Sequence, residues 1–553
     1  MNRVAILAIL AILPFGALAR RVNFSNDRTE ADVLVRELPA QWDNLVEGGQ
    51  FIDRFHPMPD GTTIDNPWGR EGVRSRFVDN GIESDIYSFW GGNIIKDKEG
   101  LYHLFVCGWK EDNPRGHRMW GRSLLFHTTC DNSIGPYHII DTIGYGHNVD
   151  TFQISDGSYV SYNISRARGG RTFGYYHSPT LYGEWEYNEL EFIARDRTIN
   201  VMSNFSFTQR ADGSVLAVGK DGRLWISRDG LNPYMLLTDY SVYPDREGFM
   251  EDPEIWRDNV QYNMVVNDAH GRVAYYGRSR NGYNWIWEDG LAYTPGKLSV
   301  HKDGTVEDWH KYERVKILQD DMGRAIQANF AVMDMDKILD KGGDNHSAKN
   351  ISIPMNAGVI LEWVKGDAKR IANSRPTIRI KAEEGFDPSQ SVDIESLRLG
   401  NYNEVSYGGG SPVVSSKVEG KDLIVTFERG EHHLAEDDFA AKLLGRDRSG
   451  ELIYGYVRLP WAKYDEAILS PLAPVAEGNR LSVRVDNLGV AKSQPSEVVI
   501  SVDGKRIGSA PLPEIEPYKD YTATIVCTEI PTHCCVEVYC NGERISDFDT
   551  PIK

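Results

Sequence analysis

Cysteine is scarce in this sequence of 553 residues, which has only six, and the 61 basic residues are outnumbered by 80 acidic ones, so that the formal net charge is −19. That charge argues against binding to nucleic acid or to anionic membranes through a broad basic surface. Four cysteines gather near the C-terminus, at Cys527, Cys534, Cys535 and Cys540. In an oxidising compartment we expect a disulfide there, although its connectivity is open. Adjacent Cys534 and Cys535 fit no common zinc spacing, so a metal site is the weaker interpretation.

Long apolar runs are absent after the first nineteen residues, so we expect no membrane span. Residues 1–19 combine one basic residue, an apolar stretch and the ending Ala17-Leu18-Ala19. This pattern is typical of a cleavable signal peptide. The sequence therefore predicts a secreted or periplasmic protein.

Helical periodicity is nearly absent from about residue 85 to 335, where short β-branched and aromatic runs alternate with glycine turns. A Gly-Arg pair opens a strand-like run at Gly121, Gly170, Gly222 and Gly271, about 50 residues apart each time. A hairpin precedes each pair, and a fifth unit fits residues 310–335. The pattern predicts an all-β chain with a five-bladed β-propeller. The alternative is a β-sandwich in which the Gly-Arg repeats are accidental.

The length predicts several domains. We expect an N-terminal arm at 20–84 that packs on the propeller, and the propeller itself at 85–365. Alternating apolar and polar residues over short strands predict two small β-sandwich modules, at 386–472 and 473–553. An immunoglobulin-like topology is our expectation for both modules.

The first strand of each propeller unit should point its end at a common channel, so residues there converge on one pocket. The candidates for binding are Trp90, Asn148 and Asn204, and the candidate acids are Asp150, Glu251 and Asp252. Carboxylates, amides and Trp without a serine nucleophile motif or a phosphate-binding loop favour acid/base chemistry on a sugar. Each residue also has a structural alternative, such as a hairpin cap, an Asx-turn or a core position.

A turn rich in polar residues follows the strand pair that Glu251 opens. It adds Asp268 as a candidate for substrate binding and His270 as a candidate for catalysis. Two loops contribute Arg118 and Arg168, which would bind sulfate or carboxylate groups of a substrate if they lie beside the pocket. The alternative for both arginines is an ordinary solvated loop charge.

The stretches HNVDTFQISDGSYVSYN and MEDPEIWRDNVQYNMVV resemble blade openings of five-bladed glycoside hydrolases, the superfamily that includes families 43 and 117. The resemblance implies that Glu251 is the general acid and that Asp150 tunes this acid and orients the substrate. It also implies His270 as a rival acid. The Asp that opens the first blade in family 43, its general base, is replaced here by Trp90-Gly91-Gly92-Asn93.

These observations predict a glycoside hydrolase for a polysaccharide or its oligosaccharides, with anionic or sulfated substrates included. The second carboxylate would be Asp150, Asp252 or Asp85. No cofactor is required, and a structural calcium or sodium ion in the channel is compatible with the acids there. The competing hypothesis is a non-catalytic carbohydrate-binding protein, and a lyase is a third.

Overall fold

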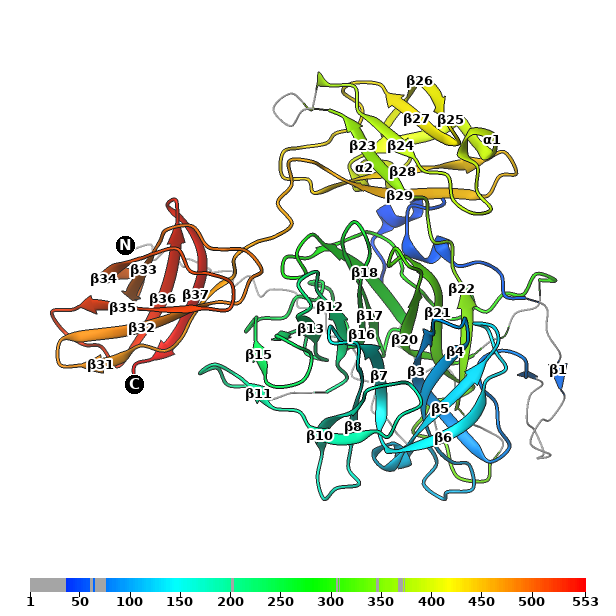
Figure 1. Cartoon of the computed structure of the whole chain (residues 1–553), viewed down its shortest axis with the longest axis horizontal. Coiled ribbons are helices and arrows are strands. Elements are labelled where there is room, and N and C mark those ends of the chain that lie inside the picture. The colour runs from blue at the N-terminus through cyan, green and yellow to red at the C-terminus, as the bar shows by residue number, and fades with distance from the viewer. Residues whose placement is uncertain are drawn as a thin grey trace, which may run out of the picture.

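The computed structural model describes residues 36–59, 63–64, 76–199, 203–304, 307, 309–344, 348–366, 371 and 373–553. Strands dominate these residues and the helices are short, so the all-β prediction is confirmed (Figure 1). The signal peptide expected at 1–19 lies outside the described residues. In the part of the chain that is described, no helix has both the length and the apolar character needed to cross a membrane.

Five consecutive antiparallel sheets occupy residues 87–354. The first contains β3 (Tyr87–Lys96), β4 (Tyr102–Lys110), β5 (Leu124–Cys130) and β6 (His138–Tyr145), with the 3-10 helix η4 (Gly116–Arg122) between β4 and β5. The second contains β7 (His147–Gln153), β8 (Tyr159–Ser165), β9 (Thr172–Ser178) and β10 (Glu186–Glu189). The third contains β12 (Ser206–Gln209), β13 (Val215–Val218), β14 (Leu224–Ser227) and β15 (Tyr234–Leu236), and β11 (Phe192–Ile193) pairs with β15 in parallel.

The fourth sheet contains β16 (Met250–Arg257), β17 (Tyr262–Asp268), β18 (Val273–Ser279) and β19 (Ile286–Trp287). The fifth contains β20 (Lys311–Gln319), β21 (Ala325–Met333) and β22 (Ala348–Pro354). The first strands of the sheets face one another: β3 contacts β7 and β20, and β16 contacts β12 and β20. Strands such as β16 and β20 are buried on both faces because neighbouring sheets cover them, whereas β6 at the periphery is mostly exposed.

A short irregularity recurs near the start of each of these five inner strands. A residue there has a left-handed φ: Gly91 (59°), Asn148 (54°), Asn204 (49°), Asp252 (51°) and Arg314 (49°), and in the first strand the next residue, Gly92, also has a positive φ (122°). In four of the five strands the pairing register with the next strand shifts at this point, as in a β-bulge. We call the space between the five inner strands the channel. In the four bulged strands, the bulge separates a start at one mouth of the channel from a continuation that faces its interior.

The interior of the channel is closed by a buried ion cluster two residues beyond the bulge. Lys316 Nζ lies 2.6 Å from Asp150 Oδ2 and 2.7 Å from Glu254 Oε2. Ser206 Oγ donates to the same oxygen of Glu254 at 2.8 Å. We propose that the ammonium of Lys316 takes the place of a structural calcium or sodium ion, with which the acids in the sequence were compatible.

The N-terminal arm runs over the fourth and fifth sheets. It contains η2 (Ala40–Asn44), η3 (Phe51–Arg54) and the strand pair β1 (Thr63–Ile64) and β2 (Arg76–Phe77). Phe51 is buried in the core shared by these two sheets. Arg36 Nε lies 2.5 Å from Asp268 Oδ2, at the end of β17.

The first module is one seven-stranded sheet, with the order β23-β24-β27-β26-β25-β28-β29, that curves around a single core. Its strands are β23 (Leu361–Lys365), β24 (Thr377–Ile380), β25 (Val392–Gly400), β26 (Ser411–Glu419), β27 (Asp422–Phe427), β28 (Ala440–Asp447) and β29 (Leu452–Arg458), and its helices are α1 (Pro388–Ser391) and α2 (Tyr402–Ser406). We expected the propeller to extend to 365 and the module to begin at 386. Because β24 pairs with both β23 and β27, the module begins at β23 instead.

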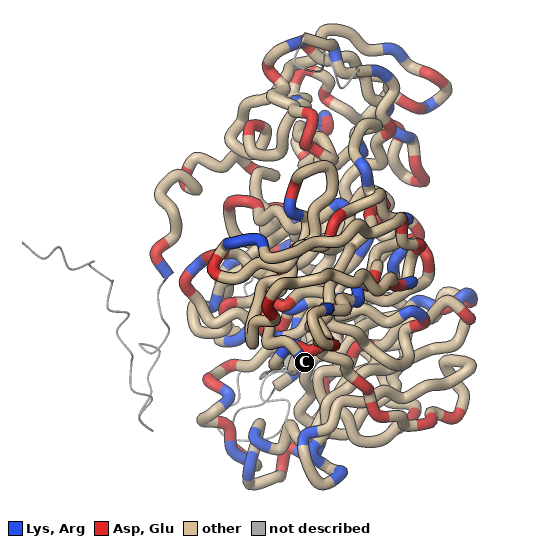
Figure 2. Tube along the Cα trace, turned by 90° about the vertical axis from the view of Figure 1, so that its left-hand side faces the viewer, with Lys and Arg blue, Asp and Glu red and all other residues tan. Residues whose placement is uncertain are grey.

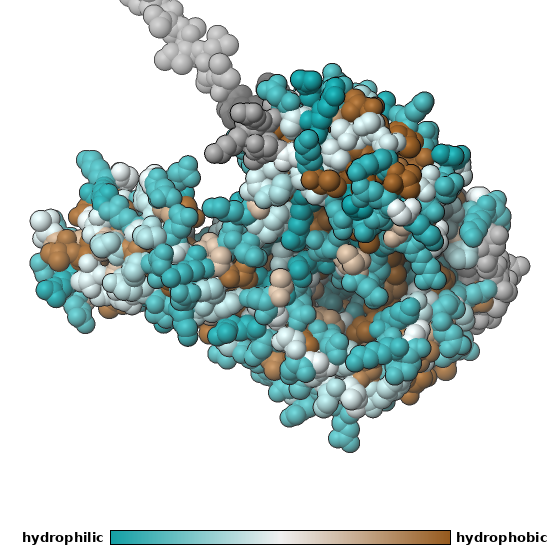
Figure 3. All heavy atoms as spheres, turned by 45° about the horizontal axis from the view of Figure 1, so that its top comes forward, coloured by the Kyte–Doolittle hydropathy of each residue, from teal (hydrophilic) through white to brown (hydrophobic). Residues whose placement is uncertain are grey.

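The second module has two sheets that share one core. One contains β30 (Leu469–Pro471), β31 (Val475–Glu477), β32 (Arg480–Asn487) and β35 (Asp520–Val526), and the other contains β33 (Ser496–Val502), β34 (Lys505–Leu512), β36 (His533–Cys540) and β37 (Glu543–Pro551). β30 begins four residues before the expected boundary at 473. The module projects from the side of the main body (Figures 1 and 3).

All six cysteines are free, so the disulfide expected in the C-terminal module is not formed. Cys534 is buried in the core of this module and its neighbour Cys535 is half-buried. Successive residues of a strand point to opposite faces of the sheet, so these two side chains do not share a partner.

Both modules contact the turns at the far ends of the inner strands. Arg458 Nε donates to the carbonyl of Val260, between β16 and β17, at 2.9 Å. Tyr518 Oη donates to Asp212, between β12 and β13, at 2.6 Å. The modules therefore leave the starts of the inner strands accessible.

Acidic and basic residues are interspersed over the chain (Figure 2).

Lys316→Met should destabilise the five-sheet region by about 3–5 kcal/mol, because two buried carboxylates lose their counter-charge. Urea unfolding followed by tryptophan fluorescence measures the change. The triple variant Lys316→Met/Asp150→Asn/Glu254→Gln should recover most of the loss, since it removes the unpaired charges as well. A loss no larger than that of Lys98→Met, at an exposed position, would contradict this account of the channel.

Candidate active site

A cavity of about 320 Å³ lies at the mouth where the inner strands start. Its lining comprises Trp90, His117, Arg118, Trp120, His147, Asn148, Arg171, Ser203, Asn204, Lys220, Glu251, Asp252, Glu313, Lys337 and Ile338. All five inner strands, or the residues that lead into them, contribute to this list. The residue directly before each of the five left-handed positions lines the cavity. The repeated irregularity therefore places one side chain from each inner strand in the cavity wall.

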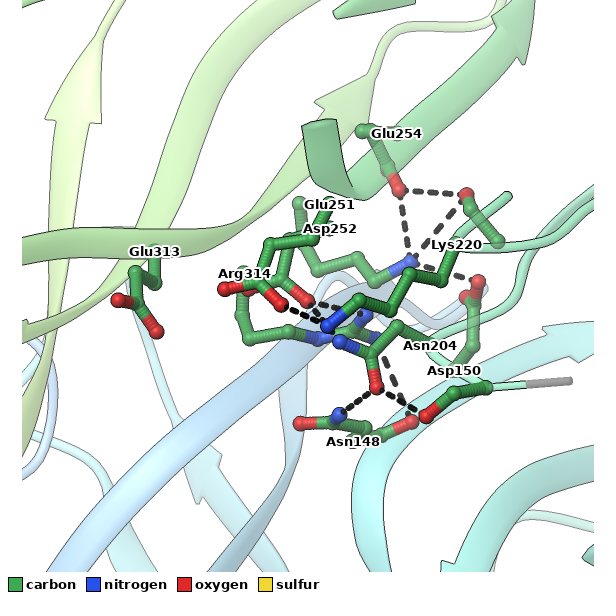
Figure 4. Close-up of polar contacts among 12 residues, drawn as sticks. Asn148, Asp150, Asn204, Lys220, Glu251, Asp252, Glu254, Glu313 and Arg314 are labelled. Carbon is green, nitrogen blue, oxygen red and sulfur yellow. Dashed lines mark hydrogen bonds and ion pairs between the residues drawn. The ribbon is translucent and has the colours of Figure 1, made fainter. Parts of the chain in front are cut away.

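Four of the five positive-φ residues, Asn148, Asn204, Asp252 and Arg314, form a ring of hydrogen bonds (Figure 4). Asn148 Nδ2 donates to Asn204 Oδ1 at 2.9 Å, and Asn204 Nδ2 donates to Asp252 Oδ1 at 2.7 Å. Arg314 closes the ring, with Nη1 3.3 Å from Asp252 Oδ1 and Nη2 3.4 Å from the carbonyl of Asn148. At Gly91 a Cβ would be in ordinary van der Waals contact with Arg314 Cβ at 3.5 Å, so it is the positive φ, and not the space, that favours glycine there.

Left-handed backbone favours Asn, Asp and Gly, which matches four of the five positive-φ positions. Arg314 is the exception. Its side chain is 1% exposed, and its two contacts in the ring hold it in place. Strained backbone of this kind persists where the surroundings over-determine it, often at functional sites.

Three buried carboxylates meet at this mouth. Glu251, Asp252 and Glu313 each offer one oxygen, and these oxygens lie within 4.8 Å of one another. Two lysines from neighbouring connections approach them. Lys220 Nζ lies 2.5 Å from Glu251 Oε2, and Lys337 Nζ lies 2.6 Å from Glu313 Oε2. The group therefore combines three buried carboxylates with two partly exposed ammonium groups.

The surroundings move the pKa values of the two glutamates in opposite directions. Burial and the neighbouring Asp252 raise the pKa of Glu251, and they outweigh the opposing charges of Lys337 and Lys220. Burial also disfavours ionisation of Glu313, but Lys337 and Lys311 overcome it and lower the pKa of Glu313 to about 2. At neutral pH Glu313 is ionised, while Glu251 holds its proton to a higher pH than an ordinary glutamate does.

Two imidazoles in the cavity wall are neutral at neutral pH. Burial holds the pKa of His147 well below its ordinary range, and burial together with Lys337 lowers the pKa of His117 to about 3. His147 Nδ1 lies 3.0 Å from Ser123 Oγ, whose hydroxyl donates to the carbonyl of Trp120 at 2.7 Å. We therefore assign the proton of His147 to Nδ1, which leaves Nε2 as a hydrogen-bond acceptor.

The residues predicted from the sequence divide into two groups. Glu251, Asp252, Trp90, Asn148, Asn204 and Arg118 line the cavity. Trp90 is only 2% exposed and meets His117 edge to face, with 4.6 Å between ring centroids. It forms part of the cavity wall and does not offer an open stacking surface.

Asp150 does not lie at this mouth. It follows the bulge of β7, so its carboxylate faces the interior of the channel, where it binds Lys316 and accepts from the backbone NH of Phe207 at 3.1 Å. We no longer assign Asp150 a catalytic role. Asp85, the other candidate for the second carboxylate, is exposed and is not part of the cavity lining.

The three remaining candidates also lie away from the cavity lining. Both oxygens of Asp268 are bound by Arg36 of the N-terminal arm, which the sequence did not pair with it. His270 packs against Phe249, with 4.8 Å between ring centroids. Arg168 donates to Tyr176 Oη at 3.0 Å and stacks on the ring of Tyr187. Their contacts are structural.

Lys220 and Lys337 were not predicted from the sequence, and Glu313 was one of two alternatives for the fifth unit, beside the strand that carries Gln327 and Asn329. Lys220 lies in the turn between β13 and β14, and Lys337 lies in the connection between β21 and β22. No local motif marks either lysine. Alignment of Glu313-Arg314-Val315-Lys316 with Glu251-Asp252-Pro253-Glu254 would have placed Glu313 beside Glu251, because both tetrads span the same bulge.

No protein-family model matches the sequence, and no curated protein matches it. Several solved structures are similar to it in fold. A family 117 glycoside hydrolase of Zobellia galactanivorans is 9% identical, with 55% of this chain and 90% of that chain covered and a TM-score of 0.38. The catalytic domain of the GH62 α-L-arabinofuranosidase of Coprinopsis cinerea is 10% identical, covering 56% and 98%, with a TM-score of 0.37.

A thermostable family-43 glycoside hydrolase is 11% identical to this chain, with 51% and 91% of the two chains covered and a TM-score of 0.34. All three similarities are distant and cover little more than half of this chain.

Glu313→Gln should make stability less dependent on pH in acid. The folded pKa of about 2 lies below the ordinary 4.5, so ionised Glu313 stabilises the fold above about pH 4.5, and this contribution is lost as the pH falls toward 2. We expect the unfolding free energies of wild type and Glu313→Gln to differ by an amount on the order of 3 kcal/mol at pH 7. This difference should narrow as the pH falls from about 4.5 toward 2. Thermal unfolding from pH 7 to pH 2 measures it.

The matched control is Glu436→Gln, which removes an exposed carboxylate elsewhere and should leave the profile unchanged. If the difference between wild type and Glu313→Gln widened as the pH fell, the lowered pKa of Glu313 would be wrong.

Proposed function

We propose that the chain is a secreted glycoside hydrolase whose five sheets are the blades of a β-propeller, with the cavity at Glu251 as its active site. The observation that carries the proposal is the buried pair Glu251 and Glu313. Their pKa values are moved apart at the same mouth, which is the arrangement that acid/base hydrolysis of a glycosidic bond requires. The two modules, for which we keep the proposal of an immunoglobulin-like topology, are accessory.

In the first step Glu251 donates its proton to the glycosidic oxygen as the bond to the anomeric carbon breaks. Glu313, which is ionised, faces the positive charge that develops on the sugar. The short separation of the carboxylates, within 4.8 Å, favours direct attack by Glu313 over a geometry that holds a water between them. In the second step Glu251 removes a proton from water, and the resulting hydroxide displaces Glu313.

Asp252 contributes through its position and not through proton transfer. Asn204 and Arg314 bind it in the ring, and its negative charge raises the pKa of Glu251. Among the second carboxylates weighed from the sequence, Glu313 replaces Asp150 and Asp85, and Asp252 acts as a positioning residue. His147 Nε2 provides an acceptor for a sugar hydroxyl at the cavity wall.

Anionic or sulfated polysaccharides and their oligosaccharides are the substrate class that we propose. Arg118 and Arg171 are exposed and line the cavity. Arginine binds sulfate and carboxylate groups through two parallel hydrogen bonds. The net charge of −19 makes these local basic residues the natural contact for such groups.

Glu251→Gln should reduce kcat about 10²–10⁴-fold on a natural polysaccharide and change KM little, because the amide keeps the shape of the side chain but has no proton to transfer. An aryl glycoside with a good leaving group needs less protonation, so the loss on it should be smaller. Reducing-end release from a panel of anionic and neutral plant and algal polysaccharides measures the activity, with Glu436→Gln, at an exposed position in the first module, as the control.

Full activity of Glu251→Gln on the natural substrate would contradict the assignment of the acid. Binding of a polysaccharide without release of reducing ends would instead favour the alternative of a non-catalytic carbohydrate-binding protein. That alternative has one specific observation in its favour, since a buried Trp90 stands where the resemblance implies a catalytic Asp.

A further inference from the structure

A second group of three carboxylates lies beside the cavity but does not line it. Glu111 directly follows β4, and Asp340 and Asp344 belong to the connection between β21 and β22. Each offers one oxygen, and these oxygens lie within 4.8 Å of one another. Glu111 and Asp340 are each 4% exposed, and Asp344 is half-buried. The group therefore joins two segments more than 200 residues apart in the sequence.

One carboxylate oxygen in this group lacks a hydrogen-bond partner. Asp340 Oδ2 accepts from the backbone NH of His117, but Asp340 Oδ1 is buried and accepts from no donor among the described residues. Burial and the charges of Glu111 and Asp344 raise the pKa of Asp340 to about 8. A buried, unpaired acceptor next to two further carboxylates is unfavourable unless a proton or a cation neutralises it, and a bound cation would displace the proton.

We propose that Glu111, Asp340 and Asp344 bind a calcium ion. Calcium takes six to eight oxygen ligands in flexible geometry, and carboxylates are among its preferred ligands. Asp340 Oδ1 supplies the oxygen that has no other partner, and Glu111 and Asp344 supply the remaining protein charge. Water and backbone carbonyls complete the coordination. Magnesium demands a stricter octahedral geometry with several retained waters, so it binds this group more weakly.

The ion would fix the connection that reaches into the cavity. Lys337 lies three residues before Asp340, and its Nζ is 2.6 Å from Glu313 Oε2. The backbone NH that binds Asp340 Oδ2 belongs to His117, which lines the same cavity. Calcium binding therefore holds Lys337 against Glu313 and acts on the proposed active site as a positioning device. This consequence rests on the proposed function, whereas the binding itself does not.

Isothermal titration of the full chain with calcium chloride, after treatment with a chelator and its removal, tests the binding. We expect one calcium site and a higher melting temperature on saturation. Asp340→Asn and Asp344→Asn should each weaken the affinity at least tenfold. Asp344 is half-buried and tolerates substitution more readily, so this variant keeps the test valid if Asp340→Asn fails to fold. Asp112→Asn removes an exposed charge next to Glu111 and should bind as the wild type does.

The absence of a calcium isotherm, or undiminished binding by both Asp340→Asn and Asp344→Asn, would overturn the proposal. So would binding that persists in these variants but disappears in Asp252→Asn, because the ion would then belong to the carboxylates at the cavity floor. A magnesium titration should give at least tenfold weaker binding, and equal affinity for both ions would overturn the assignment of calcium.

Measuring kcat/KM with and without calcium distinguishes a failure of the calcium proposal from a failure of the proposed glycoside hydrolase function. On a hydrolysed substrate, removal of calcium should lower kcat/KM for the wild type and leave Asp344→Asn unaffected. Binding without any effect on turnover would overturn the positioning role of the ion. If no glycoside is hydrolysed under any condition, the proposed function fails while the calcium isotherm still decides the binding.

Discussion

The left-handed residue near the start of each inner strand is the constraint on which the rest of the site depends. In a regular strand, side chains alternate between the two faces, and residues one and four would lie on opposite sides. The bulge changes this alternation, so that residues one and four both face the channel but at different levels. Glu251 and Glu313 face the mouth, while Glu254 and Lys316 face the interior. The backbone thus separates a level of binding and chemistry from a level that closes the channel.

Buried charges are balanced differently in the interior of the channel and at its mouth. In the interior, one ammonium between two carboxylates neutralises the channel and contributes to stability. At the mouth, three carboxylates face two lysines that come from connections and not from the inner strands. The strands therefore supply the reactive acids, and the connections set how readily each acid ionises. The connection that carries Lys337 is also the one that the proposed calcium ion would hold.

The sequence carried enough information for the repeat, the all-β class and the acids of one unit. Glu251-Asp252 stood out because acids before a proline at a strand start are unusual, and both residues line the cavity. Asp150 looked equivalent, but the bulge places it on the other side, and register shifts leave no local signature. Asp268 was misjudged because its partner Arg36 is more than 200 residues away.

The predicted start of the first module, at residue 386, was wrong for a related reason. β23 and β24 read as an extension of the propeller and a linker, yet their partners are strands that appear much later in the chain. Strand pairing over long sequence separation, like the contacts of Lys220 and Lys337, depends on the whole fold. Local patterns predict which elements form, and the pairing decides which residues meet.

The central claim is that Glu251 is a proton donor whose pKa is set by the charges around it. The pH dependence of kcat/KM for wild type, Lys220→Met and Lys220→Arg on one substrate tests this claim most directly. The Lys220 ammonium lowers the pKa of Glu251, so its loss should move the alkaline limb of the profile to higher pH, while Lys220→Arg keeps the limb in place. An alkaline limb at the same pH in all three proteins would contradict the account.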